Sequence, residues 1–203
     1  MNKSLISLLL VCLTWSAYAE QPADRLQKKL SVMHSMRAYF LQTVRVKRRL
    51  VSRSSGVMMM VRPNRFRWET QQPMAQIVVA DGKNLWMYDV ELEQVTVSKQ
   101  TRKLGLAGAL FLSGDAQAVK HDFTVTTQRS GMTETFDLQA KSNRSSFEHV
   151  QLMFKQDSLF QIILDDHLGQ HTVLRLSQVV INKPQPAGLF HLHIPPGVDV
   201  VYQ

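Results

Sequence analysis

The chain has 203 residues, with 24 lysines and arginines against 16 aspartates and glutamates, and a formal net charge of +8 at pH 7. A chain of this length can fold as one domain around its own core. It contains a single cysteine, which excludes a scaffold held together by internal disulfides.

The first 19 residues have the features of a secretory signal peptide. Lys3 precedes an apolar run from Leu5 to Leu13, and Ala17-Tyr18-Ala19 is a small-x-small cleavage site. The run is too short for a permanent membrane anchor. We expect cleavage after Ala19, which lowers the formal charge from +8 to +7 and removes Cys12. The mature domain, 20–203, is then exported and soluble, and its basic charge suits anionic lipids or acidic proteins better than nucleic acid.

Residues Asp24 to Gln42 are predicted to form one amphipathic helix. Leu26, Leu30, Met33 and Phe40 follow the helical period, and Asp24 stands near the N-terminus, where an acidic residue is favourable. We expect this helix to pack on a sheet.

A densely basic segment follows, at residues 45–49. If Val44–Ser52 is a strand, then Arg45, Lys47 and Arg49 share one face of it. The pattern favours a solvated outer face, since exposed charges also protect a sheet from unwanted pairing.

The segment from Gly56 to Thr70 predicts two strands joined by a turn at Pro63-Asn64. In the second strand, Phe66 and Trp68 alternate with charged residues, so two large aromatic rings lie on one face. Arg62 ends the apolar first strand. Its guanidinium either reaches solvent along its own stem or donates to carbonyl groups.

Further strand-like segments continue along the chain. With the three above, we expect eleven strands: Val44–Ser52, Gly56–Arg62, Arg65–Thr70, Ala75–Ala80, Asn84–Asp89, Gln94–Ser98, Lys120–Gln128, Thr133–Ala140, Glu148–Lys155, Ser158–Asp165 and His171–Ile181. Asp81-Gly82 and Gln156-Asp157 mark short hairpin connections. The pattern predicts a mainly β fold with a few helices (α+β), an antiparallel meander that forms a sandwich or a curled barrel.

The strands are interrupted at Lys103–Gly114, which predicts a short and nearly uncharged helix. A helix that is apolar on most sides must be buried. Gly105 and Gly108 weaken it by roughly 1 kcal/mol each relative to alanine. Either the segment moves in function, or it is an ordinary core helix with imperfect propensity.

Signals for catalysis or metal binding are weak. The sequence has no Gly-x-Ser-x-Gly elbow, no His-Glu-x-x-His and no glycine-rich phosphate loop. His191-x-His193 and Asp165-Asp166-His167 lack a third convergent ligand. We expect no enzyme, no cofactor and no metal.

Three motifs carry a resemblance to a known family. They are Arg62-Pro63-Asn64-x-Phe66-x-Trp68, Val79-Ala80-Asp81-Gly82-Lys83-x-Leu85-Trp86-x-Tyr88 and Pro195-Pro196-Gly197-Val198-Asp199-Val200. Together with the signal peptide and the N-terminal helix, they make the mature chain resemble the LolA family of periplasmic carriers of outer-membrane lipoproteins. The Met58–Met60 run and the basic segment Arg45–Arg49 depart from the commonest pattern of that family.

The resemblance implies an unclosed antiparallel β-barrel, of about eleven strands here, with a helical lid over a hydrophobic cavity for acyl chains. By position, Arg62 would bond backbone carbonyls of the lid as a latch, and Phe66 would lie at the cavity. The implied partners of a monomeric carrier are acylated lipoproteins as cargo, an inner-membrane ABC transporter that releases them, and an outer-membrane receptor.

The candidate cavity residues are large, apolar and adaptable, and for each of them plain core packing remains the alternative. They are Leu30, Met33, Phe40, Met58, Met60, Phe66, Trp68, Leu85, Met87, Leu106, Leu110 and Phe111.

Other functions remain open at this point. A periplasmic carrier or sensor of similar fold for another lipid or glycolipid is the main alternative. A lipid-anchored receptor would need a cysteine at the mature N-terminus, a signalling sensor would be expected to have a second domain, and a lipid hydrolase would need a nucleophile and a base.

Overall fold

The computed structural model describes residues 20–100, 116–143 and 145–203. Two α-helices, one 3-10 helix and twelve strands are found in these ranges. They are α1 (Pro22–Ser31), β1 (Ser35–Val46), β2 (Arg49–Val61), β3 (Arg65–Gln72), β4 (Gln76–Asp81), β5 (Asn84–Asp89), β6 (Gln94–Lys99), α3 (Ala116–Asp122), β7 (Phe123–Ser130), β8 (Thr133–Ala140), β9 (Phe147–Lys155), β10 (Ser158–Asp166), β11 (Gln170–Ile181), η1 (Ala187–Phe190) and β12 (Asp199–Tyr202).

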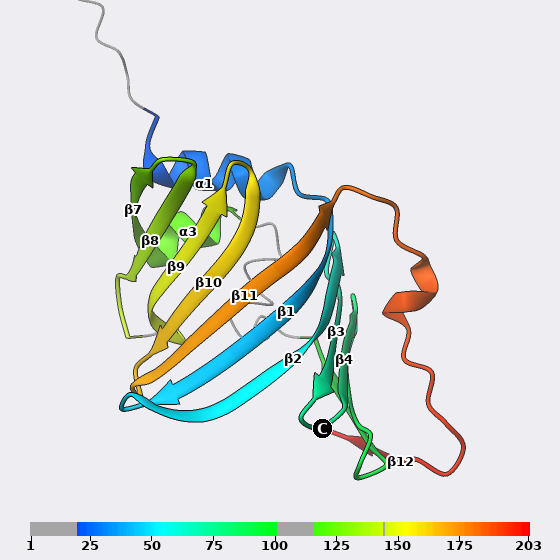
Figure 1. Cartoon of the computed structure of the whole chain (residues 1–203). Coiled ribbons are helices and arrows are strands. Elements are labelled where there is room, and N and C mark those ends of the chain that lie inside the picture. The colour runs from blue at the N-terminus through cyan, green and yellow to red at the C-terminus, as the bar shows by residue number, and fades with distance from the viewer. Residues whose placement is uncertain (1–19, 101–115, 144) are drawn as a thin grey trace, which may run out of the picture.

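All twelve strands belong to one sheet in the order β12-β6-β5-β4-β3-β2-β1-β11-β10-β9-β8-β7. The sheet is strongly curved and does not close, because its end strands β7 and β12 lie apart (Figure 1). The predicted fold, an unclosed antiparallel sheet with few helices, is confirmed. The twelfth strand was not predicted. β12 pairs with β6 in parallel, whereas the other neighbours are antiparallel.

The predicted helix Asp24–Gln42 is wrong in its second half. α1 ends at Ser31, and β1 begins at Ser35. Met36, Ala38 and Phe40 are buried at every second position, which is the period of a strand. Met36 and Phe40 also fit the helical period. The choice is made by pairing, since β1 is a central strand between β2 and β11.

The predicted strand Val44–Ser52 is also wrong. β1 ends at Val46, and a two-residue turn, Lys47-Arg48, leads into β2. Both turn residues have positive φ angles, of 47° and 67°. Such a turn usually contains Asn or Gly, so two basic residues at these positions did not indicate a turn. Arg45, Lys47 and Arg49 therefore do not share a face of one strand.

The start of the predicted strand Lys120–Gln128 is helical instead, since α3 continues to Asp122 and β7 begins at Phe123. The other predicted strands are found within about two residues of their expected ends at most positions, although β2 begins well before Gly56. The turns at Pro63-Asn64, Asp81-Gly82 and Gln156-Asp157 connect β2 to β3, β4 to β5 and β9 to β10.

The main core lies on one face of the sheet, which we call the inner face. Side chains from most of the strands and from both α-helices meet there; they include Leu26, Leu30, Phe40, Met60, Phe66, Val119, Phe136, Leu152, Ile162 and Leu174. In Figure 1, α1 crosses one end of the sheet and α3 lies behind β8 and β9. Burial of these large apolar side chains is the main favourable term for the fold.

The opposite, outer face is covered in part by the C-terminal segment. Phe190 of η1 packs on Val57 and Met59 of β2, and Leu192 and Ile194 pack near Tyr88 and Val95. Arg67 strengthens this attachment, because its guanidinium donates to the Leu189 carbonyl at 3.1 Å. This explains why β2 to β6 have apolar residues on both faces. Within the described ranges, no helix is long and apolar enough to cross a membrane.

Candidate functional site

The inner face of β1, β2 and β3 forms a continuous apolar surface. Register places Met58 opposite Trp68 and Met60 opposite Phe66. The Phe40 ring stacks on Trp68 with centroids 3.8 Å apart and 27° between the planes. The Phe66 ring lies 6.1 Å from that of Trp68. The predicted alternation in β3, with aromatic rings on one face and charges on the other, is confirmed.

A glycine makes this close aromatic packing possible. Gly56 of β2 pairs with Phe40 on one side and Thr70 on the other. A Cβ atom added to Gly56 would lie 1.8 Å from the Glu69 carbonyl oxygen and 3.0 Å from the Phe40 ring. Only glycine fits here, because any side chain would push β3 away.

Most of the predicted cavity residues come together on this surface. Leu30, Met33, Phe40, Met58, Met60 and Phe66 are buried members of the inner cluster, and Trp68 and Leu85 are half-buried against it. Met87, two residues after Leu85, is 40% exposed and is not part of that cluster. Leu106, Leu110 and Phe111, and the whole predicted lid Lys103–Gly114, lie outside the described residues.

Arg62 follows directly on β2. Its backbone N–H donates to the His34 carbonyl at 2.9 Å. The alternation of Met58 and Met60 in β2, continued by one step beyond the strand, predicts that its side chain lies on the inner side of the sheet. It is half-buried, and this burial lowers the pKa of the Arg62 guanidinium. An arginine nevertheless stays charged at neutral pH. A cation is therefore held at the border of an apolar surface.

The Asp-Gly-Lys motif builds a turn. The Asp81 carboxylate accepts the backbone N–H groups of Lys83 and Asn84, both at 2.7 Å, and the indole N–H of Trp86 at 2.8 Å. Burial acts to raise the pKa of Asp81, but these three hydrogen bonds outweigh it, and the pKa is lowered. Next to it, Gln100 bonds the Gly82 N–H and the Asn64 carbonyl. These bonds join the two turns that carry two of the sequence motifs.

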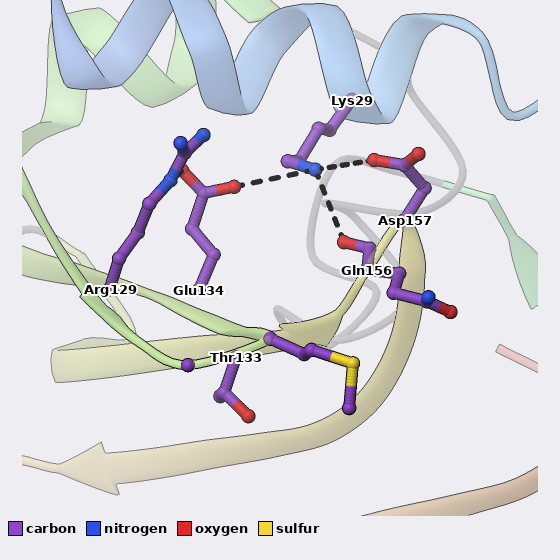
Figure 2. Close-up of a pocket in the computed structure, with 8 residues that line it drawn as sticks. Lys29, Arg129, Thr133, Glu134, Gln156 and Asp157 are labelled. Carbon is purple, nitrogen blue, oxygen red and sulfur yellow. Dashed lines mark hydrogen bonds and ion pairs between the residues drawn. The ribbon is translucent and has the colours of Figure 1, made fainter.

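A second candidate site, which sequence reasoning missed, is a polar pocket of about 220 Å³ under α1 (Figure 2). Glu134 of β8, which is only 5% exposed, is one of the residues that line it. Its carboxylate pairs with Arg25, with Arg129 at 3.3 Å and with Lys29 at 3.4 Å. Lys29 also binds Asp157 at 2.8 Å. This arrangement fastens α1 to the β8 and β9–β10 end of the sheet, and its polar lining does not suit an apolar ligand.

On the outer face, Asp165 belongs to a row of hydrogen-bonded carboxylates and imidazoles whose other members the sequence reasoning missed. The two ring nitrogens of His149 lie 3.0 Å from Asp137 and 3.2 Å from Asp165, and Asp165 also bonds His171 at 2.6 Å. Strand pairing brings these side chains together, since Asp165 pairs with both His149 and His171. In the part of the chain that the structure describes, no group of three or more His, Cys, Asp or Glu side chains is arranged to hold a metal ion.

The fold and this surface define a class: open, strongly curved antiparallel sheets with an apolar inner face. The family model of the outer membrane lipoprotein carrier protein LolA matches residues 31–193. The chain belongs to this family.

Curated relatives agree with the family model. The chain is 45% identical to an outer-membrane lipoprotein carrier protein of Legionella pneumophila (strain Corby), with 100% of both chains covered. It is 33% identical to the protein of the same name in Coxiella burnetii (strain CbuK_Q154), over 98% of this chain and 96% of that one. Among solved structures, an uncharacterized conserved protein of Thermus thermophilus shares the fold, with a TM-score of 0.58, 15% identity, and 90% and 100% of the two chains covered.

Proposed function

We propose that this protein is a periplasmic carrier, without enzymatic activity, that binds the acyl chains of lipoproteins and takes them from the inner to the outer membrane. The observation that carries the proposal is the apolar inner face of an unclosed sheet, in a chain of the lipoprotein carrier family. An inner-membrane ABC transporter would supply the cargo, and an outer-membrane receptor would accept it.

The inner face suits ligands of variable shape. Met33, Met36, Met58 and Met60 are all buried in its cluster. Methionine is unbranched and flexible, so such a wall can adapt to different acyl chains. The aromatic rings of Phe40, Phe66 and Trp68 provide a rigid part of the same surface.

A carrier must also release its cargo. Burying a methylene group is worth about 0.8 kcal/mol, so burial of roughly a dozen of them would contribute about 10 kcal/mol. That corresponds to dissociation constants well below about 1 µM. Some term must therefore oppose binding in the loaded state if the cargo is to move on to a receptor.

Arg62 is suited to supply this term. Its guanidinium lies half-buried at the border of the inner face, with several donors on a rigid plane. If it bonds carbonyls of the predicted lid, entry of an acyl chain breaks those bonds and raises the free energy of the loaded state. Charge-assisted bonds of this kind are worth roughly 1.5–3 kcal/mol.

The compartment follows from the signal peptide proposed for 1–19. We expect the exported form to begin at Glu20 and to be recovered from the periplasm. N-terminal sequencing of that form tests this step. A membrane-bound product that retains a lipid-modified Cys12 would contradict it.

The acyl-binding face can be tested with the protein's own tryptophans. Trp15 leaves with the signal peptide, Trp68 lies on the inner face, and Trp86 packs in the outer cluster with Tyr88. A brominated fatty acid quenches only a tryptophan that it approaches closely. We expect strong quenching in Trp86→Phe, where Trp68 remains, and little in Trp68→Phe, where Trp86 remains.

The two variants are compared at probe concentrations that saturate each of them, because Trp68→Phe alters the proposed binding face itself. Titration gives the affinity, and native mass spectrometry of the exported protein shows whether lipid or lipoprotein is bound. Equal quenching of both tryptophans, or stronger quenching of Trp86, would refute the proposed binding face.

A further inference from the structure

The tip of the β1–β2 hairpin combines strong positive charge with exposed apolar side chains. Residues 45–53 contain five cations and no acidic residue: Arg45, Lys47, Arg48, Arg49 and Arg53. Leu50 and Val51 lie among them and are 60% and 63% exposed. Single exposed apolar side chains are common on protein surfaces, so it is their position among five cations that sets these two apart.

A second turn adds to the same corner of the molecule. β1 pairs with β11, and this register places Val46 opposite Gln170. The β10–β11 turn therefore lies beside the hairpin tip, as Figure 1 shows at the lower left. Leu168 in this turn is 87% exposed. The nearby Asp166 carboxylate is engaged within its own turn, where it accepts the N–H groups of Leu168 and Gln170.

The hairpin tip has two unusual backbone features. Its turn residues Lys47 and Arg48 both adopt positive φ angles, which asparagine and glycine adopt with less strain. At Val51, the register shifts, because Val44 pairs with Ser52 but Arg45 pairs with Leu50. This bulge leaves Val51 as an extra residue in β2. Cations therefore occupy two turn positions that usually hold asparagine or glycine. The bulge also adds one exposed apolar residue, Val51, to β2.

The opposite charge pattern is found at another corner. In the β5–β6 turn, Leu92 is 71% exposed but stands between Glu91 and Glu93. Exposed apolar side chains therefore occur both at an acidic turn and at a basic one. The β1–β2 tip is the basic case, with five cations around Leu50 and Val51. Leu92 provides a natural comparison for experiments.

We propose that the β1–β2 hairpin tip, together with Leu168, is a docking site for an anionic phospholipid bilayer. A protruding tip with cations around leucine and valine fits a lipid interface: the cations approach the phosphates and the apolar side chains enter between headgroups. A protein partner would instead need an acidic groove shaped to this tip. The site is distinct from the inner face and does not depend on cargo.

Edge protection is the competing explanation for these charges. β3 pairs with β2 only from Ser55 onward, so Arg49–Ser54 forms an edge on that side. Charged residues on an edge prevent pairing with other chains. This explanation predicts self-association when the charges are removed, but no binding to vesicles in the native protein.

The first experiment measures co-sedimentation of the cargo-free exported protein with vesicles. Vesicles of phosphatidylcholine with about 30% phosphatidylglycerol, at about 50 mM salt, should bind it, and pure phosphatidylcholine vesicles should bind it weakly. K47Q/R48Q/R49Q should lower the affinity by about 100-fold, since each cation near an anionic surface contributes roughly a factor of five. K28Q/K155Q/K183Q removes the same charge from exposed positions elsewhere and should have a much smaller effect.

The second experiment tests insertion of the apolar side chains. The exported chain has no cysteine once Cys12 is removed, so Leu50→Cys can be labelled with the fluorophore NBD, and Leu92→Cys provides the matched control. Emission at position 50 should brighten and shift to the blue on phosphatidylglycerol vesicles, whereas position 92 should not change. Circular dichroism confirms that each variant is folded.

The proposal is wrong if the native protein does not bind phosphatidylglycerol vesicles, or if both triple variants bind them equally well. Self-association of K47Q/R48Q/R49Q with unchanged vesicle binding would establish edge protection instead. Binding to an acidic protein without binding to vesicles would also overturn it. None of these results depends on whether the inner face binds acyl chains.

Discussion

Phe66 is the residue at which a role in binding can be separated most clearly from a role in folding. It is 8% exposed, and it lies opposite Met60 in β2 and Ala80 in β4. Its neighbours on the inner face, Trp68 and Leu85, are only half-buried. Phe136 of β8 is the matched control, since it is fully buried. Its ring packs edge-on against that of Phe154, with the two ring centroids 5.8 Å apart.

The two phenylalanines should respond differently to alanine. In a closed core, Phe→Ala costs about 3–5 kcal/mol, because the cavity that remains cannot collapse. We expect Phe136→Ala to lie in this range. The half-buried neighbours of Phe66 can move into the space, so we expect Phe66→Ala to cost about 2 kcal/mol, close to the transfer free energy of the side chain.

The order should be reversed for ligand binding. If Phe66 contacts about two methylene groups of an acyl chain, its loss removes about 1.6 kcal/mol, or roughly fifteenfold in affinity. Phe136→Ala should bind nearly as well as the native protein under conditions where both are folded. Urea denaturation gives the stability, and titration with a fluorescent fatty acid gives the affinity.

Two results would refute this reasoning. If Phe66→Ala binds the probe within twofold of the native protein, Phe66 does not contact the ligand. If both variants lose affinity in proportion to their loss of stability, Phe66 is an ordinary core residue.

Three further predictions concern the turns and strands around this face. Arg62→Leu should still bind an acyl probe but release it at least tenfold more slowly, with partial recovery in Arg62→Lys; an unchanged release rate in a stopped-flow transfer assay to acceptor vesicles would exclude a latch. Asp81→Asn should lower the free energy of unfolding by about 1 kcal/mol at pH 7. Because the folded-state pKa of Asp81 is lowered, its stabilisation is present above about pH 4 and is lost as the pH falls through the folded-state pKa, so native and variant stabilities should converge in acid denaturation; a constant difference would contradict this. Gly56→Ala should cost about 3 kcal/mol or more by thermal or urea denaturation, because its Cβ would overlap the Glu69 carbonyl, whereas Gly188→Ala, with open space around it, should be nearly neutral; equal effects would refute the packing argument.

Local patterns in the sequence were sufficient for most of the strands and turns. Period-two alternation in β3 placed Phe66 and Trp68 on one face correctly, because this period is a property of the extended backbone. The turns at Asn64 and Gly82 were predicted from the turn dipeptides Pro63-Asn64 and Asp81-Gly82, and in the structure both residues adopt positive φ angles. The same motifs led to the family.

Errors arose where the local pattern fitted two structures. Met36 and Phe40 satisfy both helical and strand periods, and the pairing of β1 with β2 and β11 decides between them. Lys47 and Arg48 form a turn that their residue types do not predict. Its position is set by the pairing register of β1 with β2. β12 is too short to be recognised alone, and its parallel pairing with β6 depends on the path of the C-terminal segment.

The sequence alone was sufficient to infer the β-rich class and the family. It also indicated the apolar composition of the inner face and most of the residues expected at the binding surface. Which residues share a surface became known only from the folded chain. Glu134 meets Arg25 across 109 positions, and the β1–β2 tip lies beside Leu168. Such contacts depend on strand register and sheet curvature, which are properties of the whole sheet, whereas periodicity and turn chemistry act over only a few residues.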